Sequence, residues 1–334
     1  MSNRSHYNDR HIAMNRLNKT GKPHSSALTY EISKKTYHGV FLEDSIQFLK
    51  KIPNGSIQLI LIDPPYNLDI ASWDKFSNYM DWAKQWLDEI ERVLSDNGSF
   101  VVFGGFQYQD EATSGDLLDI MYYLRHNTKL KLVNLIVWRY KTGMSAHRFF
   151  ANRHEEIIWF AKSRKYYFDL DAVRVPFDEA TKQLYRKDKR LNPESIEKGK
   201  NPTNIWEIER LVGNSLERVG HPTQKPLEVI RRLIKGLSYP GSIVLDFFAG
   251  SGTTAIACIE EGRNSIIVDN DKKMLEYLNL HLDKLKERCH NTLVSTCALI
   301  GVKHRLDISL TDTHQRNWIF CIDEHNQRYR SLGE

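Results

Sequence analysis

The 334-residue sequence has few cysteines, and it lacks both a long apolar segment and the apolar core of a signal peptide. Its cysteines form no CxxC pair and have no zinc-ligand spacing with histidine; they are Cys258, Cys289, Cys297 and Cys321. We therefore expect reduced thiols and no metal site. Because no run of about eighteen apolar residues offers a membrane span, a soluble protein of the cytoplasm is expected.

The sequence also has only a small excess of basic over acidic residues. With 47 basic and 42 acidic residues, the net charge is +5. This balance is compatible with a polyanionic partner but is too weak to identify one. Hydrophobic residues make up 41% of the chain, which is enough for a sizeable core in one large α/β domain or two modest ones.

Strand-like and helix-like segments alternate along most of the chain. Continuous apolar runs predict strands at residues 37–44, 56–63, 100–105, 134–140, 156–162 and 264–271, with a strand, a glycine turn and a helix over 242–262. Amphipathic spacing predicts helices at 45–52, from 79 to the DNG of 96–98, and at 226–238. This alternation predicts an α/β fold, a doubly wound and mostly parallel sheet covered on both faces.

Three segments fall outside this alternation. Residues 1–30 are polar and basic, which predicts a flexible N-terminal arm. The periodicity fades between 163 and 215, and the stretch from Lys182 to Lys200 carries an excess of basic residues. Residues 290–334 read as one or two strands and a polar tail, for which the sequence offers no function.

A glycine turn closes the strand that ends at Asp246. In VLDFFAGSGTT, Gly250 and Gly252 allow a close approach of the backbone to a ligand, as at the nucleotide sites of open α/β sheets. The lysine of a P-loop and the third glycine of a dinucleotide fingerprint are both missing. Asp269 ends the next strand, where a carboxylate can accept the hydroxyls of a ribose. An adenosine-like cofactor without a pyrophosphate is expected, and S-adenosylmethionine fits better than NAD.

A second strand ends on a carboxylate in LILIDPPYNLD, residues 59–69. Methyl transfer to the exocyclic amine of a base needs hydrogen-bond acceptors that free the nitrogen lone pair. Asp63 offers its carboxylate and Pro64 its carbonyl oxygen, which Pro64 and Pro65 hold in place because their φ angles are fixed. Tyr66 is expected to stack on the base once it has left the helix.

The order of these motifs carries a family resemblance. DPPY early, HPTQKP at 221–226 and the glycine turn just after it resemble the β group of amino-methyltransferases that act on DNA. The resemblance implies a Rossmann-like, S-adenosylmethionine-dependent catalytic domain over 31–141 and 216–289. It also implies that His221, Thr223 and Lys225 line the cofactor pocket and that Asp44 lies near the cofactor's adenine. Asp44 is equally suited to cap the helix that follows it.

The predicted site therefore has two parts. The catalytic residues are Asp63, Pro64, Pro65 and Tyr66. The cofactor residues are Asp44, Asp63, His221, Thr223, Lys225, Asp246, Phe247, Phe248, Gly250, Ser251, Gly252, Thr253 and Asp269.

The family places its target-recognition region between the two catalytic segments, here at residues 142–215. Side chains for phosphates and base edges are expected there, and the candidates are Arg148, Arg153, Lys187, Lys189, Arg190 and Asn192. MSAHRFFANRHEE, KDKRLNPES and GNSLERVGHPTQKP extend the resemblance through this region to a family member that acts at GAATTC. The same target sequence is therefore expected.

The leading interpretation is an adenine-N6 methyltransferase of double-stranded DNA that belongs to a restriction-modification system. A cytosine-N4 enzyme is the nearest alternative, although serine commonly replaces Asp63 there. RNA or protein methylation and a non-catalytic DNA-binding relative are further alternatives. The resemblance raises two protein partners that the sequence leaves open: a second copy of the chain in a homodimer, and a cognate restriction endonuclease acting on the same site. No membrane partner is expected.

Overall fold

The computed structural model of the chain describes residues 36, 38–66, 76–105, 116–143, 147 and 150–292. The predicted N-terminal arm, residues 1–30, lies outside the described residues, and so do residues 293–334 of the predicted C-terminal extension. Among the described helices, none is long and apolar enough to cross a membrane.

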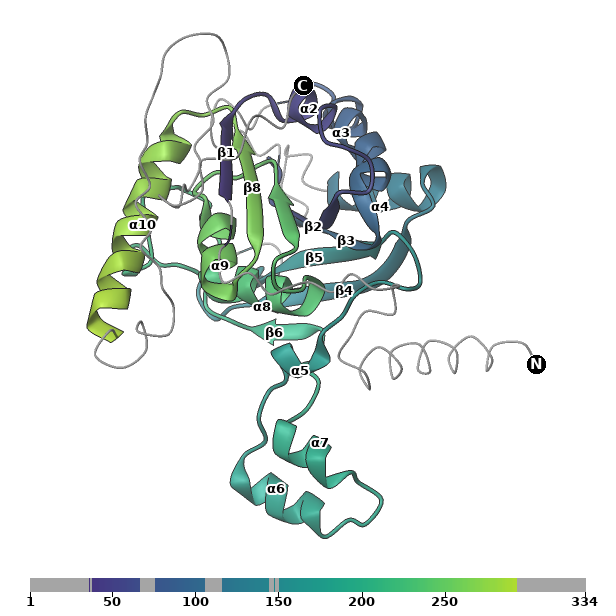
Figure 1. Cartoon of the computed structure of the whole chain (residues 1–334), viewed down its shortest axis with the longest axis vertical. Coiled ribbons are helices and arrows are strands. Elements are labelled where there is room, and N and C mark those ends of the chain that lie inside the picture. The colour runs from purple at the N-terminus through teal and green to yellow at the C-terminus, as the bar shows by residue number, and fades with distance from the viewer. Residues whose placement is uncertain are drawn as a thin grey trace, which may run out of the picture.

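A sheet of eight strands forms the centre of the described chain (Figure 1). The strands are β1 (His38–Leu42), β2 (Ile57–Ile62), β3 (Leu94–Gly104), β4 (Lys131–Arg139), β5 (His154–Ala161), β6 (Ile205–Glu207), β7 (Ile243–Asp246) and β8 (Asn264–Asp269). Their order is β1-β8-β7-β2-β3-β5-β4-β6. β5 runs antiparallel to both of its neighbours, and the other pairs are parallel. The predicted mostly parallel α/β sheet is confirmed.

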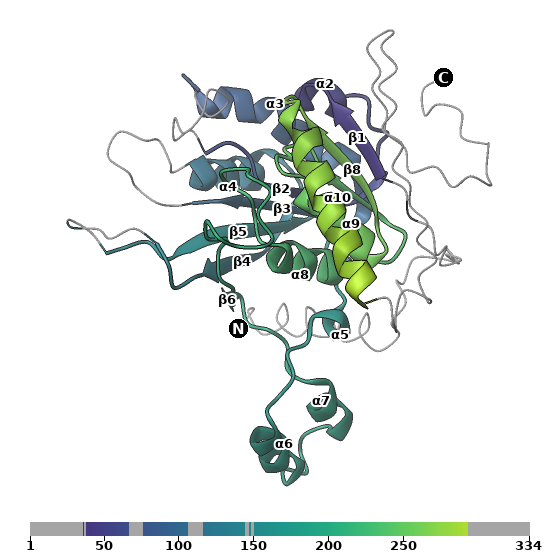
Figure 2. The ribbon, with the colours of Figure 1, turned by 90° about the vertical axis from the view of Figure 1, so that its left-hand side faces the viewer.

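Two groups of helices lie on opposite sides of the sheet (Figure 2). One group contains α2 (Ser45–Leu49), α3 (Tyr79–Val93) and α4 (Asp116–Asn127); the other contains α8 (Leu227–Leu237), α9 (Thr253–Glu261) and α10 (Lys273–Thr292). β2 reads IQLILI without a polar break after Gln58 because it is buried on both faces. Leu59 and Leu61 join the core on the α8 and α9 side, while Ile60 and Ile62 join the core under α3.

The predicted helix from residue 79 is shorter than expected. Trp86, Ile90 and Val93 form its fully buried face, as their helical spacing predicts. The helix ends at Val93, and the segment up to the DNG of 96–98 belongs to β3 instead, because Leu94 pairs with Ile57 of β2. The extension of α3 to DNG is therefore wrong.

Short elements fill the segment in which the sequence shows no periodicity. They are α5 (Leu170–Val173), α6 (Glu179–Arg186), α7 (Pro193–Lys198) and β6. α6 and α7 extend away from the sheet (Figures 1 and 2), and we refer to residues 176–199 as the α6–α7 lobe. A two-way backbone pairing of Val175 with Lys200 joins the lobe to the rest of the chain. α4 and α10 were likewise not predicted.

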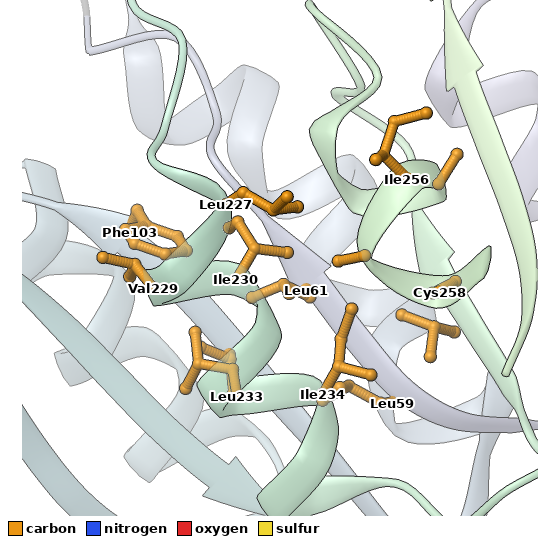
Figure 3. Close-up of a cluster of buried hydrophobic side chains, with 14 of the residues drawn as sticks. Leu59, Leu61, Phe103, Leu227, Val229, Ile230, Leu233, Ile234, Ile256 and Cys258 are labelled. Atoms are coloured by element: carbon orange, nitrogen blue, oxygen red, sulfur yellow. The ribbon is translucent and has the colours of Figure 1, made fainter. Parts of the chain in front are cut away.

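The contact of α8 with β2 gives a test of the core. Ile230 and Ile234 of α8 point toward Leu59 and Leu61 (Figure 3), and Ile234 is fully buried. We expect Ile234→Ala to lower the free energy of unfolding by about 2–5 kcal/mol, because it leaves a cavity in a packed core. Leu184→Ala, at a position 64% exposed on α6, should change it by less than about 0.5 kcal/mol. Urea unfolding followed by circular dichroism measures both, and equal effects would contradict this packing.

Candidate active site

The central strands β2 and β7 lie side by side although about 180 residues separate them in sequence. Ile60 pairs with Leu245 in parallel register. From β2 the chain continues through α3 to β3 on one side, and from β7 it continues through α9 to β8 on the other. Ligands bind at such a switch point, outside the carboxyl ends of the strands. Asp63 directly follows β2 and Asp246 ends β7, so the fold brings both carboxylates to this point.

Both oxygens of Asp63 accept hydrogen bonds. The Tyr66 hydroxyl donates to Oδ1 at 2.6 Å, and Lys225 Nζ donates to Oδ2 at 2.5 Å. Burial, followed by the charge of Asp63, raises the pKa of Tyr66 well above its usual value, so the hydroxyl keeps its proton. Pro64 is buried, and no described residue donates to its carbonyl oxygen. Each carboxylate oxygen can accept a second hydrogen bond, so Asp63 and Pro64 retain capacity for an incoming amine.

Asp246 lies at the bottom of the same site. Its carboxylate accepts hydrogen bonds from the Thr254 hydroxyl at 2.6 Å and from the Phe248 backbone N–H at 3.1 Å. Burial is the main cause that raises its pKa to about 7, because these two donors are neutral and stabilise the anion only in part. Within the described residues no cation contacts it. A buried carboxylate of this kind fits a ligand with a cationic end.

The glycine turn lies between Asp246 and α9. Gly250 has φ +48° and Gly252 has φ +77°, values that side chains rarely adopt. A Cβ at Gly250 would lie 3.0 Å from His221 Nε2, so glycine also allows the HPTQKP segment to approach the turn. Gly252 is the N-cap residue of α9. The turn thus presents backbone and a helix N-terminus toward the site.

Asp44 and Asp269 lie together at the next strand ends. Leu42 pairs with Asp269, and the Glu43 backbone N–H donates to the carbonyl oxygen of Asp269 at 3.1 Å. The Asp44 side chain caps α2 by accepting from the Gln47 backbone N–H. The Asp269 carboxylate accepts from the Gly250 backbone N–H at 2.8 Å. Asp44 thus forms the helix cap that the sequence allows, and Asp269 is tied to the glycine turn.

His221 and Thr223 form a compact turn against this site. The Thr223 backbone N–H donates to His221 Nδ1 at 3.3 Å. Burial lowers the pKa of His221 below its usual value, so the imidazole is neutral near pH 7. Its ring packs edge-on against Tyr277 of α10. This packing fixes the start of HPTQKP and directs Lys225 toward Asp63.

Glu155 belongs to the site, and it is missing from the prediction. Its Oε2 lies 3.4 Å from Lys225 Nζ, opposite Asp63. Because β5 is antiparallel, its first residues meet the carboxyl ends of β2 and β3. Burial is the main cause that raises the pKa of Glu155, and the charge of Lys225 opposes it. An acid placed just before the apolar run IIWFA is the only signal in the sequence, and it gives no strand direction.

These side chains surround one pocket of about 370 Å³, part of it open to solvent. Its lining includes eight predicted residues: Asp63, Thr223, Lys225, Asp246, Phe248, Gly250, Ser251 and Thr253. His221 is not part of the lining and lies behind Gly250, against which it packs. Thr254, Phe103 and Ile230 also line it and were not predicted. The Phe247 side chain is buried against Trp86, and its carbonyl oxygen accepts from the Ser45 hydroxyl. Phe247 therefore supports the pocket from outside.

The predicted DNA contacts lie apart from this pocket. Lys187, Lys189, Arg190 and Asn192 occupy the connection between α6 and α7. Asn192 caps α7 by accepting from the Glu194 backbone N–H, and Arg190 pairs with Asp188. Within the described part of the chain, Lys187 and Lys189 have no ion-pair partner. Arg153 is half-buried and donates to the Asn152 carbonyl oxygen, whereas Arg148 lies outside the described residues.

Comparison with known proteins agrees with this geometry. Residues 57–280 match a family model described as DNA methylase. The type II methyltransferase M.ScaI of Streptomyces caespitosus is 31% identical over 80% of this chain and 84% of its own length. The DNA adenine methyltransferase YhdJ of Escherichia coli K12 is 31% identical over 77% and 84%. The solved structure of the PvuII cytosine-N4-specific DNA methyltransferase, 18% identical, superposes with a TM-score of 0.58 over 78% of this chain and 94% of its own; it shares the fold.

The raised pKa of Asp246 gives a test in the absence of any ligand. Between pH 4 and 7 the folded chain holds a proton on Asp246 that the unfolded chain, with a carboxyl pKa near 3.8, has lost. The unfolding free energy should therefore fall as pH rises through this window, by up to about 1.4 kcal/mol per pH unit. Asp246→Asn should remove this part of the slope and be the more stable protein at pH 8. Urea unfolding at several pH values measures this dependence. The same change of unfolding free energy with pH in both proteins would contradict the raised pKa of Asp246.

Proposed function

The chain belongs to the DNA methylase family, and from that premise we propose that it transfers a methyl group from S-adenosylmethionine to N6 of adenine in double-stranded DNA. The observation that carries the proposal is the pairing of β2 with β7. This pairing sets a rigid acceptor pair, Asp63 and Pro64, beside a pocket whose buried carboxylate, Asp246, has no cation beside it among the described residues.

The residues of the pocket fit this methyl donor. S-Adenosylmethionine carries an ammonium group and a sulfonium, and Asp246 is a buried carboxylate without a cation among the described residues. The glycine turn permits close approach of the ligand, and there is no phosphate-binding lysine after it. Asp44 and Asp269 lie at adjacent strand ends, where the nucleoside part is proposed to bind. When bound, the donor supplies an electrophilic methyl group.

The protein's own part in the reaction is to hold the amine. Asp63 accepts one hydrogen of the exocyclic amine and the Pro64 carbonyl oxygen accepts the other, which directs the lone pair toward the methyl group. Tyr66 stacks on the base after it is flipped out of the duplex. Placement by fixed groups lowers the entropic part of the barrier, and it requires neither a covalent nucleophile nor a metal. Among the described residues no cluster suited to a metal ion occurs.

Adenine is the proposed base because the motif begins with Asp63 and because the similar protein YhdJ is named an adenine methyltransferase. A cytosine-N4 enzyme would use the same chemistry, and it is the principal alternative. A non-catalytic DNA-binding relative is opposed by the intact acceptor pair and pocket.

GAATTC is the proposed target, and a restriction-modification system is the proposed setting. Residues 142–215 resemble the corresponding segment of the RsrI adenine methyltransferase, and the relative M.ScaI is named a type II enzyme. A cognate endonuclease acting at the same site is part of this proposal. A homodimer is not required, since the two strands of a palindromic site can be modified in turn.

The proposal is tested by incubating the full chain with labelled S-adenosylmethionine and unmethylated genomic DNA, followed by sequencing that detects modified bases. Methyl-adenine at one short motif is the expected result, and GAATTC would support the target. Methyl-cytosine would favour the alternative base. Label on RNA or protein with none on DNA would overturn the substrate.

We expect Asp63→Ala to abolish methyl transfer while lowering the affinity for S-adenosylmethionine by no more than on the order of tenfold, the effect of one charge removed from the pocket. The amine loses its charged acceptor, whereas Lys225 keeps Glu155 as a partner and Asp246 is unchanged. Calorimetric titration with the cofactor, measured beside the transfer assay, separates the two effects. Retained turnover would contradict the acceptor role of Asp63.

The α6–α7 lobe is proposed to bind DNA phosphates through Lys187 and Lys189. The double variant Lys187→Ala/Lys189→Ala should weaken binding of all sequences and reduce the slope of log affinity against log salt by about one unit for each lysine. Lys129→Ala/Lys131→Ala is the matched control, because these two lysines at the start of β4 are also exposed, two residues apart and without an ion-pair partner among the described residues. Fluorescence anisotropy of a labelled duplex at several salt concentrations measures the slope, and equal slopes for both double variants would exclude the lobe.

A further inference from the structure

Lys225 stands between two acids in a nearly closed space. Its ammonium donates to Asp63 at 2.5 Å on one side and lies 3.4 Å from Glu155 Oε2 on the other, while its side chain is only 8% exposed. Glu155 Oε2 is buried, and its partner among the described residues is the ion-paired ammonium of Lys225. The aromatic rings of Tyr66 and Phe103 lie 5.3 and 5.4 Å from the ammonium.

Asp63, Lys225 and Glu155 form a trio whose protonation states depend on one another. Burial alone would lower the pKa of Lys225, but Asp63 and Glu155 outweigh it and leave the pKa raised, so the lysine stays protonated. With Glu155 ionised beside it, the three side chains carry a net charge of −1. If Glu155 were neutral, Lys225 would cancel Asp63 and the net charge would be zero.

We infer that Glu155 is a positioning residue that neutralises Lys225, so that Lys225 can orient Asp63 without cancelling its negative charge. The inference rests on the proposed function, because it takes Asp63 as the acceptor of the target amine. Glu155 touches neither the base nor the donor in this assignment; it acts through Lys225.

The chemistry of the pocket explains why this charge matters. In the proposed reaction the sulfur–methyl bond breaks as the nitrogen–methyl bond forms, so a positive charge leaves the donor's sulfur and develops on the amine nitrogen, which then loses one proton to solvent. Asp63 and Lys225 both line the pocket, so without Glu155 the ammonium would cancel the attraction of Asp63 for this charge at each stage. In a buried site this interaction between charges is poorly screened by solvent and salt. A lysine that aligns the acceptor therefore requires a second acid behind it.

Binding of two cofactor forms tests the inference without any DNA. S-Adenosylmethionine is a sulfonium cation, and S-adenosylhomocysteine is the neutral thioether of nearly the same shape. The binding ratio is the affinity for the cation divided by the affinity for the thioether, and calorimetry on the full chain measures both. Glu155→Gln should lower this ratio by on the order of tenfold. Glu156→Gln is the control, because it removes the neighbouring carboxylate of β5, whose side chain is 7% exposed against 21% for Glu155 and which pairs with His154 on the other face of the strand.

Two further variants separate charge from structure. Glu155→Asp keeps the charge and should keep the binding ratio near that of the wild type. The double variant Glu155→Gln/Lys225→Met leaves Asp63 as the only charge of the trio and restores its net charge to −1. Its binding ratio should return toward the wild-type value, although it lacks two side chains. Thermal unfolding of each variant identifies any that fail to fold.

Turnover on DNA provides the second measurement. Glu155→Gln should lower kcat by on the order of 10²-fold with little change in KM for DNA. The double variant should have a higher kcat than Glu155→Gln. A Glu155→Gln protein with wild-type binding ratio, or a double variant no better than the single one, would overturn the inference. Failure of the proposed function looks different: the wild type would transfer no methyl group to DNA, while the binding ratios would still report on the trio.

Discussion

The parallel pairing of β2 with β7 is the constraint on which the rest of the site depends. The two strands come from opposite ends of the catalytic sequence, and Ile60 and Leu245 meet in register. Their alignment places Asp63 and Asp246 at one edge of the sheet and lets the chain diverge to either side through α3 and α9. The pocket lies where the two connections separate, as ligand sites of open α/β sheets do. Both halves must fold together before either acid has a function.

The site holds more buried charge than stability alone would favour. Burial raises the pKa of Asp246 by more than its two neutral hydrogen-bond donors lower it, and burial raises the pKa of Glu155 by more than the charge of Lys225 lowers it. Burying such groups opposes folding, and the apolar layers on both faces of β2 offset this cost. A binding partner of opposite charge relieves it locally. The affinity for a cationic ligand and the instability of the free site are therefore two consequences of the same desolvation.

How far the sequence predicts the site depends on the direction of the strands. Asp63 and Asp246 could be placed because each directly ends an apolar run, and carboxyl ends of parallel strands share an edge. Glu155 could not, because nothing in HEEIIWFA shows that β5 runs against its neighbours. The contact of Lys225 with Asp63 spans 162 residues and depends on the turn at His221. The positions of these acids at one edge thus followed from motifs, whereas the side chains that contact them could be identified only from the fold.

The helices of the α6–α7 lobe were not predicted from the sequence, for a different physical reason. Its helices are short, and Leu184 on α6 is 64% exposed, so no apolar face repeats at helical spacing over a useful length. Ion pairs between the helices, such as Arg186 with Glu197, neutralise part of its basic excess. Exposed pairs of this kind contribute little to stability. A basic excess read from sequence therefore overstates the charge available to a polyanion, and Lys187 and Lys189 carry the part that no described acid neutralises.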